Sequence, residues 1–503
     1  MGNNFVSAVT VQVFLIPRHY FYCRLTHRLH PYLLLGTKAV HGYLYHIIII
    51  QMIIGVIFLP SEVNKIKYIF QFIKNHPYSP KGVEFIYNPT TLETCDQVIW
   101  YGLKEVAPQT SAYCIPRQNC LLNHQPHEPL PPLYANHYVW EGNTLFSVET
   151  TTTKEQQPFF AENLFGFDLL VMLFFHLSRL EEYHVGSAYD SLGRRHTSSY
   201  FLVKEGLTET PVVDDLVRSF WQVMGLTPQT IRAHYSISHD VDYVRKFSSY
   251  SDLWRNLAGT FYHGRSWAEF MQNFRAYQQA KQDITSDPYY AFPFLFRASG
   301  VYRSKQLYLL AGGEHPHERP YDLDAPKVRE MIFLAKSRDY QVGLHPSTRA
   351  ARDEHQFEQQ KKHLEKILQH PIVISRQHYL LFLFPQTLHI LQNQGIQEDS
   401  SLGYRDCLGY RCGTAFPYYL YDLVHNQEST ILEKPLIFMD SALWHQTNYD
   451  PKSFISKMFT FIQSQPGSAM HFNFHNSFFD STLPGYAVLK QAYLDLTKTM
   501  ENT

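Results

Sequence analysis

The stretch YSISHDVDYVRKF, residues 235–247, places Asp240 and Asp242 two positions apart, directly after a strand-like run. Because side chains alternate along an extended chain, both carboxylates would point to the same side of a strand. Two like charges on one face repel each other unless a metal ion, a proton or solvent separates them. The first question is therefore what chemistry this aspartate pair performs.

Strand-like runs alternate with amphipathic helical patterns from residue 231 onward. The runs are IRAHYSI (231–237), QLYLLAG (306–312), YQVGL (340–344), PIVIS (371–375), KPLIFM (434–439) and AMHFNF (469–474). Between them, VREMIFLAKSR (328–338) and FISKMFTFI (454–462) have apolar residues at helical spacing. This alternation predicts a parallel sheet, either open or closed into a barrel.

Polar side chains follow five of these six runs. They are Asp240 and Asp242, then His345, then Arg376 and His378, then Asp440, and finally His475 and Asn476. In (β/α) barrels the catalytic side chains come from the carboxyl ends of the strands. We therefore expect Asp240, Asp242, His345, His378 and His475 to converge at one end of the sheet, together with Arg411 from GYRCGTAFPY (409–418).

The first half of the chain predicts a different region. NKIKYIFQFIKN (64–75) has helical spacing, whereas GVEFIYN (82–88) and QVIWYG (97–102) resemble short strands. We expect a mixed α/β domain over residues 52–228. Residues 1–51 contain no acidic residue, and we expect a poorly structured extension there. The apolar run at 47–60 is too short to cross a bilayer, so a buried strand starting at Met52 is favoured over a membrane anchor.

Bulk composition narrows the classes of partner. The 503 residues include 44 Lys+Arg and 45 Asp+Glu, a formal net charge of -1, so no basic excess points to nucleic acid or an anionic membrane. The six cysteines contain no C-x-x-C pair, which favours free thiols in a reducing compartment. We expect a cytoplasmic protein with no nucleic-acid partner and no stable membrane span.

Taken in order, these segments resemble the polysaccharide deacetylase family, in the branch with an additional N-terminal domain. The resembling segments are FHLSRLEEY (175–183), SHDVD (238–242), GLHPS (343–347), RQHYL (376–380), GYRCGTAFPY (409–418) and FNFHNSFF (472–479). The resemblance extends over most of residues 52–503. It implies that residues 229–503 form a distorted (β/α) barrel, preceded by the smaller mixed α/β domain.

The resemblance also implies an activity and a set of roles. Family members use a divalent metal to hydrolyse an acetyl group from a carbohydrate, which makes a carbohydrate or polysaccharide the expected substrate and zinc the expected metal. Asp242 and His345 would bind the metal, and Asp240 would act as the base. Arg411 would orient Asp240, and His475 would act as the general acid. The roles of Asp240 and Asp242 follow the family's order, and the swapped assignment stays open.

One position departs from the family pattern. The second motif usually carries a further histidine four residues after the first, but here Arg349 follows His345 at that spacing. A catalytic zinc site needs three protein ligands. His378 is the expected third metal ligand, with His315 and His317 as alternatives. If the third ligand is missing, the alternative function is a catalytically inactive glycan-binding or scaffold protein of the same fold.

Overall fold

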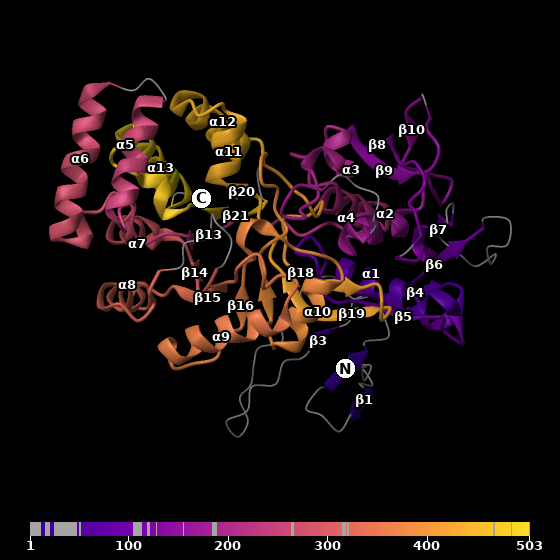
Figure 1. Ribbon diagram of the computed structural model, residues 1–503. Coiled ribbons are helices and arrows are strands. Elements are labelled where there is room, and N and C mark those ends of the chain that lie inside the picture. The colour runs from indigo at the N-terminus through magenta and orange to yellow at the C-terminus, as the bar shows by residue number, and fades with distance from the viewer. Residues whose placement is uncertain are drawn as a thin grey trace, which may run out of the picture.

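The computed structural model describes most of the chain (Figure 1). The described residues are 12–15, 21–24, 48–49, 52–103, 113–117, 121–126, 128–153, 155–183, 189–262, 266–313, 318, 321–465, 468–483 and 485–501. Within residues 1–51 they form the short strands β1 (Gln12–Leu15), β2 (Phe21–Arg24) and β3 (Ile48–Ile49), which pair in one small sheet. The rest of the expected extension lies outside the described residues.

A six-stranded sheet organises the first half of the chain, in the order β11-β12-β7-β6-β4-β5. Its strands are β4 (Met52–Ile57), β5 (Val83–Tyr87), β6 (Gln97–Gly102), β7 (Tyr113–Pro116), β11 (Phe160–Ala161) and β12 (Leu164–Phe165). Helix α1 (Val63–Asn75) connects β4 to β5, and the apolar face expected from its spacing is buried. Helix α2 (Leu169–Leu177) is apolar apart from His176 and is buried along its whole length, and the Asp168 carboxylate caps its start by accepting from the amide of Val171.

Smaller elements complete this half. Strands β8 (Tyr134–Trp140), β9 (Asn143–Glu149) and β10 (Gln157–Pro158) form a separate sheet in the order β10-β8-β9. Helices α3 (Phe201–Lys204) and α4 (Val212–Val223) follow α2 along the chain. Figure 1 shows α2, α3 and α4 beside this sheet, on the side of the molecule away from α5 and α6.

A nine-stranded sheet organises the second half, in the order β18-β19-β17-β16-β15-β14-β13-β21-β20. Its strands are β13 (His234–Val241), β14 (Ser304–Leu310), β15 (Gln341–His345), β16 (Ile374–Ser375), β17 (Glu398–Asp399), β18 (Tyr418–Asp422), β19 (Gln427–Glu433), β20 (Phe438–Met439) and β21 (Ala469–Asn473). All neighbours pair in parallel except β18 and β19, which are antiparallel. The predicted parallel sheet is therefore confirmed.

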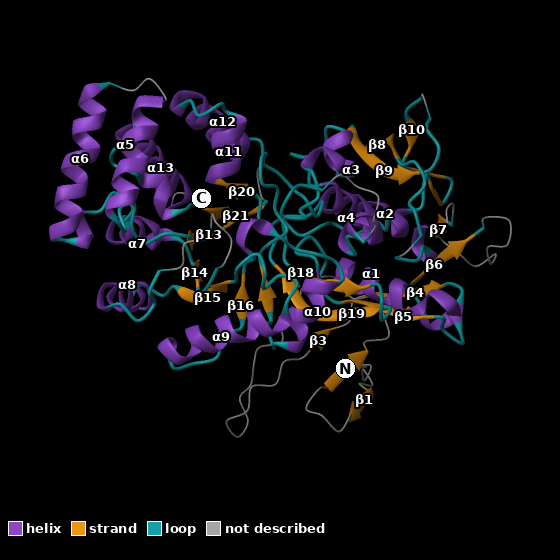
Figure 2. Ribbon diagram, viewed as in Figure 1, coloured by secondary structure: helices purple, strands orange, loops and turns teal. Residues whose placement is uncertain are grey.

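Helices lie between these strands along the chain or follow the last of them, as Figure 2 shows by colour. They are α5 (Tyr250–Tyr262), α6 (Trp267–Gln282), α7 (Phe292–Ala298), α8 (Pro326–Lys336), α9 (Glu354–Leu368), α10 (Gln386–Asn393), α11 (Asp440–Gln446), α12 (Pro451–Gln463) and α13 (Tyr486–Glu501). Helices α8 and α12 match the two predicted amphipathic segments. Their buried residues, such as Met331 and Met458, recur at helical spacing.

The expected closure of this sheet into a barrel is not found among the described residues. Strands β20 and β18 stand at opposite ends of the order, and no backbone pairing joins them. The edge at β18 contacts the first half of the chain instead. The hydroxyl of Tyr68 donates to the carbonyl of Tyr419 at 2.7 Å, and that of Tyr183 donates to the carbonyl of Tyr421 at 3.4 Å. Side chains of the first half therefore satisfy edge carbonyls that barrel closure would otherwise satisfy.

Buried apolar side chains from both halves form one continuous cluster. Backbone contacts also join the halves, since the amide of Val213 donates to the carbonyl of Gly413 at 2.9 Å. Within the described residues, no helix is long and apolar enough to cross a membrane. The boundary expected near residues 228–229 stays a prediction.

Candidate metal and catalytic site

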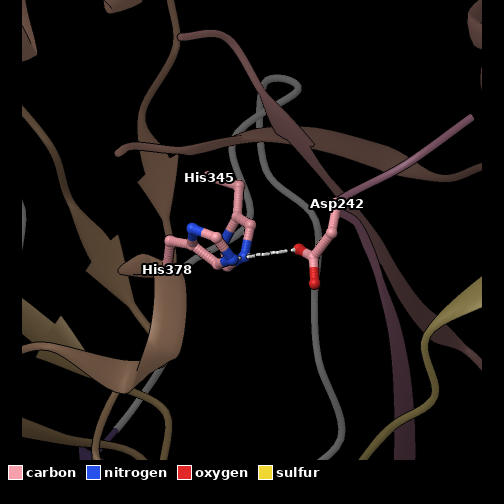
Figure 3. A group of neighbouring side chains, drawn as sticks. All are labelled: Asp242, His345 and His378. Atoms are coloured by element: carbon pink, nitrogen blue, oxygen red, sulfur yellow. Dashed lines mark ion pairs between the residues drawn. The ribbon is translucent and has the colours of Figure 1, made fainter. Parts of the chain in front are cut away.

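Three potential metal ligands converge at the carboxyl ends of β13, β15 and β16 in the nine-stranded sheet (Figure 3). Asp242 follows β13, His345 ends β15, and His378 lies three residues after β16. Their ligand atoms all lie within 4.8 Å of one another. Asp242 Oδ1 is 3.2 Å from His345 Nε2 and 3.6 Å from His378 Nε2. The structure thus brings together the three residues that were predicted as metal ligands.

Both histidines are oriented through their other ring nitrogen. His345 Nδ1 lies 2.6 Å from the carbonyl oxygen of Arg376, and His378 Nδ1 lies 3.0 Å from Glu318 Oε1. A carbonyl only accepts, so Nδ1 of His345 donates to it, and Nε2 is the ring nitrogen that faces Asp242. Metal-binding histidines commonly donate their second nitrogen to a carbonyl or carboxylate in this way.

The environment of Asp242 fits a cation. Its Oδ1 is buried and has no hydrogen-bond partner among the described residues, although both imidazole nitrogens lie close. Burial alone would raise the pKa of Asp242, but His378 and His345 outweigh it and hold that pKa well below its usual value. Two imidazoles and one carboxylate, with room for a further ligand, match the ligand set of catalytic zinc sites.

A second His/Asp cluster differs in its bonding. His389 Nε2 and His425 Nδ1 lie 2.9 Å and 2.7 Å from the same Asp422 Oδ2, at hydrogen-bond distance. Asp422 Oδ1 accepts from the amides of Val424 and His425. Every oxygen of this carboxylate therefore has a partner, and the cluster needs no cation to explain it.

Asp240 lies beside the three potential ligands and is enclosed by donors. Its Oδ1 accepts from Arg376 Nη1 at 2.9 Å, and its Oδ2 accepts from Asn473 Nδ2 at 2.9 Å. Burial alone would raise the pKa of Asp240, but Arg376, His345 and His475 lower it below its usual value. Asp240 is therefore ionised, as a general base requires.

The arginine at Asp240 is Arg376, which corrects the expected role of Arg411. Arg411 instead forms a buried ion pair with Glu182 and donates to the carbonyl of Gly403 at 3.1 Å. The motif GYRCGTAFPY resembles the arginine motif in letters, yet its arginine joins the two halves of the chain. Arg376 directly follows β16 and shares the RQHYL segment with His378. This position after a strand is the sequence feature from which Arg376 could have been predicted as the partner of Asp240.

His475 completes the group from the other side. Its Nδ1 lies 2.6 Å from Asp440 Oδ1, and its Nε2 lies 3.9 Å from both Asp240 Oδ2 and Asp242 Oδ2. Burial alone would lower the pKa of His475, but Asp440, with Asp242 and Asp240, raises it to about 10. His475 is thus a protonated imidazolium aimed at the aspartate pair. Asp440 was not predicted as a site residue, although it too follows a strand-like run.

These side chains open into a cavity of about 370 Å³. That volume falls in the range of small-molecule sites. The cavity is lined by the potential ligands, by Asp240, Asp440 and His475, by the apolar side chains of Met439, Trp444 and Phe478, and by Arg194 and Arg405. Arg194, from the first half of the chain, carried no sequence signal, and neither did Glu318.

The position of Arg349 resolves the departure from the family pattern. Its side chain is 52% exposed and pairs with Asp353, and it does not line the cavity. His378, from the next strand, occupies the place beside His345 and Asp242. The alternative histidines His315 and His317 lie outside the described residues.

Comparisons with known proteins give only distant similarity. Residues 56–227 match a family of unknown function, DUF7033. No curated protein matches the chain in sequence. A protein from Mycobacterium smegmatis assigned as a polysaccharide deacetylase aligns with 15% identity and a TM-score of 0.34, covering 55% of this chain and 87% of its own.

Two further solved structures align over the same share of the chain. A 4-alpha-glucanotransferase from Thermococcus litoralis gives 11% identity and a TM-score of 0.34, covering 55% of this chain and 38% of its own. A mutant of a CE4-family pseudoenzyme with restored activity gives 6% identity and a TM-score of 0.28, covering 54% and 65%. TM-scores this low do not establish a shared fold.

Proposed function

We propose that this protein is a metal-dependent hydrolase that removes an acetyl group from an N-acetylated carbohydrate. The observation that carries the proposal is the pair of histidines held through Nδ1, both with Nε2 facing the buried Oδ1 of Asp242. An ionised aspartate and a protonated imidazole flank that group in one cavity. The motif order in the sequence supports the same chemistry.

Asp242, His345 and His378 would hold the metal. When bound, a divalent ion such as zinc would activate water and polarise the scissile carbonyl. Asp242 contributes the carboxylate, and the two histidines contribute Nε2. Glu318 and the carbonyl of Arg376 keep these rings in place, because each accepts from the Nδ1 proton.

Asp240 is the proposed general base. Arg376 and Asn473 hold one oxygen each, so the carboxylate keeps a fixed orientation and its negative charge. As the water oxygen bonds to the carbonyl carbon, the proton that the water loses passes to Asp240. Its enclosure by Arg376 lowers its basicity, which a general base tolerates when the water is already acidified.

His475 is the proposed general acid. The carbon–nitrogen bond breaks as Nε2 of His475 gives its proton to the departing amine, and acetate forms from the acyl group and the water oxygen. Asp440 stabilises the imidazolium through Nδ1, as a carboxylate does behind a catalytic histidine. The proton on Asp240 then returns to His475, and the second proton of the water leaves to solvent as acetate forms.

Metal analysis combined with an N-acetyl hydrolysis assay tests this proposal. We expect the full chain, purified with added zinc, to hold one zinc ion per chain and to release acetate from an N-acetylglucosamine oligomer. Asp242→Ala should lose both properties. The matched control is His425→Ala in the second His/Asp cluster, which should leave the zinc content unchanged.

The alternative of an inactive glycan-binding protein gives a different result. Such a protein would bind the oligomer without stoichiometric zinc and without acetate release. The sequence argument for it was Arg349 in place of a histidine, and the position of His378 beside Asp242 and His345 supports the hydrolase instead.

A further inference from the structure

One wall of the cavity carries two arginines from distant parts of the chain. Arg194 Nε and Arg405 Nη1 donate to the same oxygen, Asp190 Oδ2, at 2.8 Å and 2.7 Å. The other oxygen of Asp190 accepts from the amides of Leu192 and Arg194. Asp190 does not itself line the cavity. Its carboxylate therefore holds both guanidiniums from the side that faces away from the cavity.

The arginine wall, formed by Arg194 and Arg405, has N–H donors that make no hydrogen bond to the described residues. Within the described residues, the Nη2 groups of Arg194 and Arg405 make no hydrogen bond, and the contact from Arg194 Nη1 to the carbonyl of Tyr379 is long at 3.4 Å. A second acid, Asp406, lies 3.6 Å from Arg405 Nε, also outside the cavity lining. Asp190 and Asp406 therefore contact the two arginines from outside the cavity lining, while Arg194 and Arg405 themselves line the cavity as cationic donors.

The catalytic acids do not need these arginines. Asp240 is paired with Arg376, Asp440 with His475, and Asp242 with the two histidines. Arg194 and Arg405 thus remain as cavity-facing cations without a role in the proposed reaction. Charged side chains that are held in place and face a cavity are suited to a ligand of opposite charge.

The wall is rigid and close to the site of reaction. The loop that carries Arg194 is anchored by Arg352, whose Nη2 donates to the carbonyl of Leu192 at 2.6 Å. The Arg194 guanidinium lies 5.3 Å from the centre of the Tyr379 ring, which stacks on the His378 ring at 4.0 Å. Only one aromatic ring therefore separates Arg194 from a proposed metal ligand.

We infer that Arg194 and Arg405 form a subsite for an anionic group of the substrate, a carboxylate or a phosphate. This inference rests on the proposed function and narrows its substrate class to an acidic N-acetyl sugar. Because Arg194 lies so near His378, the anionic group belongs to the sugar that loses its acetyl group or to its direct neighbour. Guanidinium forks bind either anion through paired N–H donors.

Binding of three matched sugars tests the subsite without requiring hydrolysis. The probes are N-acetylglucosamine, N-acetylglucosamine 6-phosphate and N-acetylmuramic acid, which adds a lactyl carboxylate to the same sugar. We expect calorimetry on the zinc-loaded full chain carrying Asp240→Asn to give about tenfold tighter binding of at least one anionic sugar. The preferred anion then distinguishes a sugar acid from a sugar phosphate. The preference should weaken from about 0.05 M to about 0.5 M salt.

Variants of the wall decide the outcome. The double variant Arg194→Gln/Arg405→Gln should bind all three sugars equally, whereas Arg255→Gln, at a side chain 59% exposed and outside the cavity, should keep the preference. If the double variant does not fold, Arg405→Gln alone should lose most of the preference for the anionic sugar. Equal affinity in the parent protein, or a preference that survives in the variants, overturns the subsite. If the wild type neither holds zinc nor releases acetate but the preference follows the arginines, the proposed function fails and the subsite stands.

Discussion

The guanidinium of Arg376 and the carboxylate of Asp240 form an enclosed ion pair, with Nη1 and Oδ1 2.9 Å apart and side chains 0% and 3% exposed. The same guanidinium lies 4.5 Å from the centre of the Tyr308 ring and donates to Ser238 Oγ at 2.7 Å. Since the carbonyl of Arg376 also accepts from His345, one residue orients both the proposed base and a proposed metal ligand.

Replacing Arg376 with methionine should destabilise the protein by about 3–5 kcal/mol, because it leaves a buried carboxylate without its cation. Arg376 lowers the pKa of Asp240, so the pair stabilises the fold above the ordinary aspartate pKa, and that stability is lost as the pH falls through the lower pKa of the folded state. Urea unfolding should therefore show the largest deficit near pH 7. Adding Asp240→Asn to the Arg376 variant should recover part of the lost free energy of unfolding. If the two substitutions lower that free energy additively, Arg376 and Asp240 are not coupled.

Glu318→Gln should weaken zinc binding by roughly 10- to 100-fold, because the acceptor that orients His378 loses its charge. Competition with a chromophoric chelator measures this affinity in the full chain. Arg349→Ala is the matched control, since Arg349 stands where the family pattern has a histidine yet lies outside the cavity. Equal weakening in both variants would mean that the ring of His378 is not held through Glu318.

Single substitutions of the proposed ligands and of the proposed base should have different effects on zinc content and turnover. Asp242→Ala, His345→Ala and His378→Ala should each lose stoichiometric zinc. Asp240→Asn should keep the zinc, while turnover falls by roughly 10²–10⁴ as expected for a general base. Zinc content and acetate release from the same preparations check both statements. Loss of zinc in Asp240→Asn but not in Asp242→Ala would swap the two roles.

The strand-like runs allowed much of this site to be predicted, because the carboxyl ends of parallel strands meet at one edge. Asp242 and His378 follow β13 and β16, His345 ends β15, and the parallel order of these strands brings the three residues together. The closed barrel was not predicted correctly. Whether β18 pairs with β20 or packs on Tyr68 and Tyr183 depends on contacts between distant segments, which local patterns do not encode.

Arg411 shows the same limit at the level of one residue. Its motif resembles the expected arginine motif, but burial of Glu182 in the first half of the chain supplies a closer partner. Arg194 reaches the cavity, and Glu318 reaches the outer nitrogen of His378, from segments whose sequences have no periodic pattern. Their roles follow from tertiary contacts alone, such as the approach of Glu318 to His378.

Arg411→Met should lower stability with little effect on catalysis. Burial alone would raise the pKa of Glu182, but Arg411 and Arg179 bring it to about 2. Glu182 thus stabilises the fold above its unfolded pKa of about 4.3, and this stability is lost as the pH falls through about 2. We expect a loss of about 3 kcal/mol near neutral pH in urea unfolding. Zinc content and turnover per folded molecule should stay within about twofold of wild type, and a turnover loss like that of Asp240→Asn would restore the family's assignment of Arg411.

Asp440→Asn should shift the alkaline limb of the pH–rate profile to lower pH. The carboxylate of Asp440, with Asp242 and Asp240, raises the pKa of His475 to about 10 despite burial, so the imidazole keeps its proton through neutral pH. Removing the charge of Asp440 lowers the pKa of His475 by about 1–3 units. His475 then loses its proton, and with it the general acid, at a correspondingly lower pH. The measurement is kcat/KM for acetate release between about pH 5 and 11, with zinc content measured in parallel. An unshifted alkaline limb at full zinc occupancy would mean that His475 does not supply the proton to the departing amine.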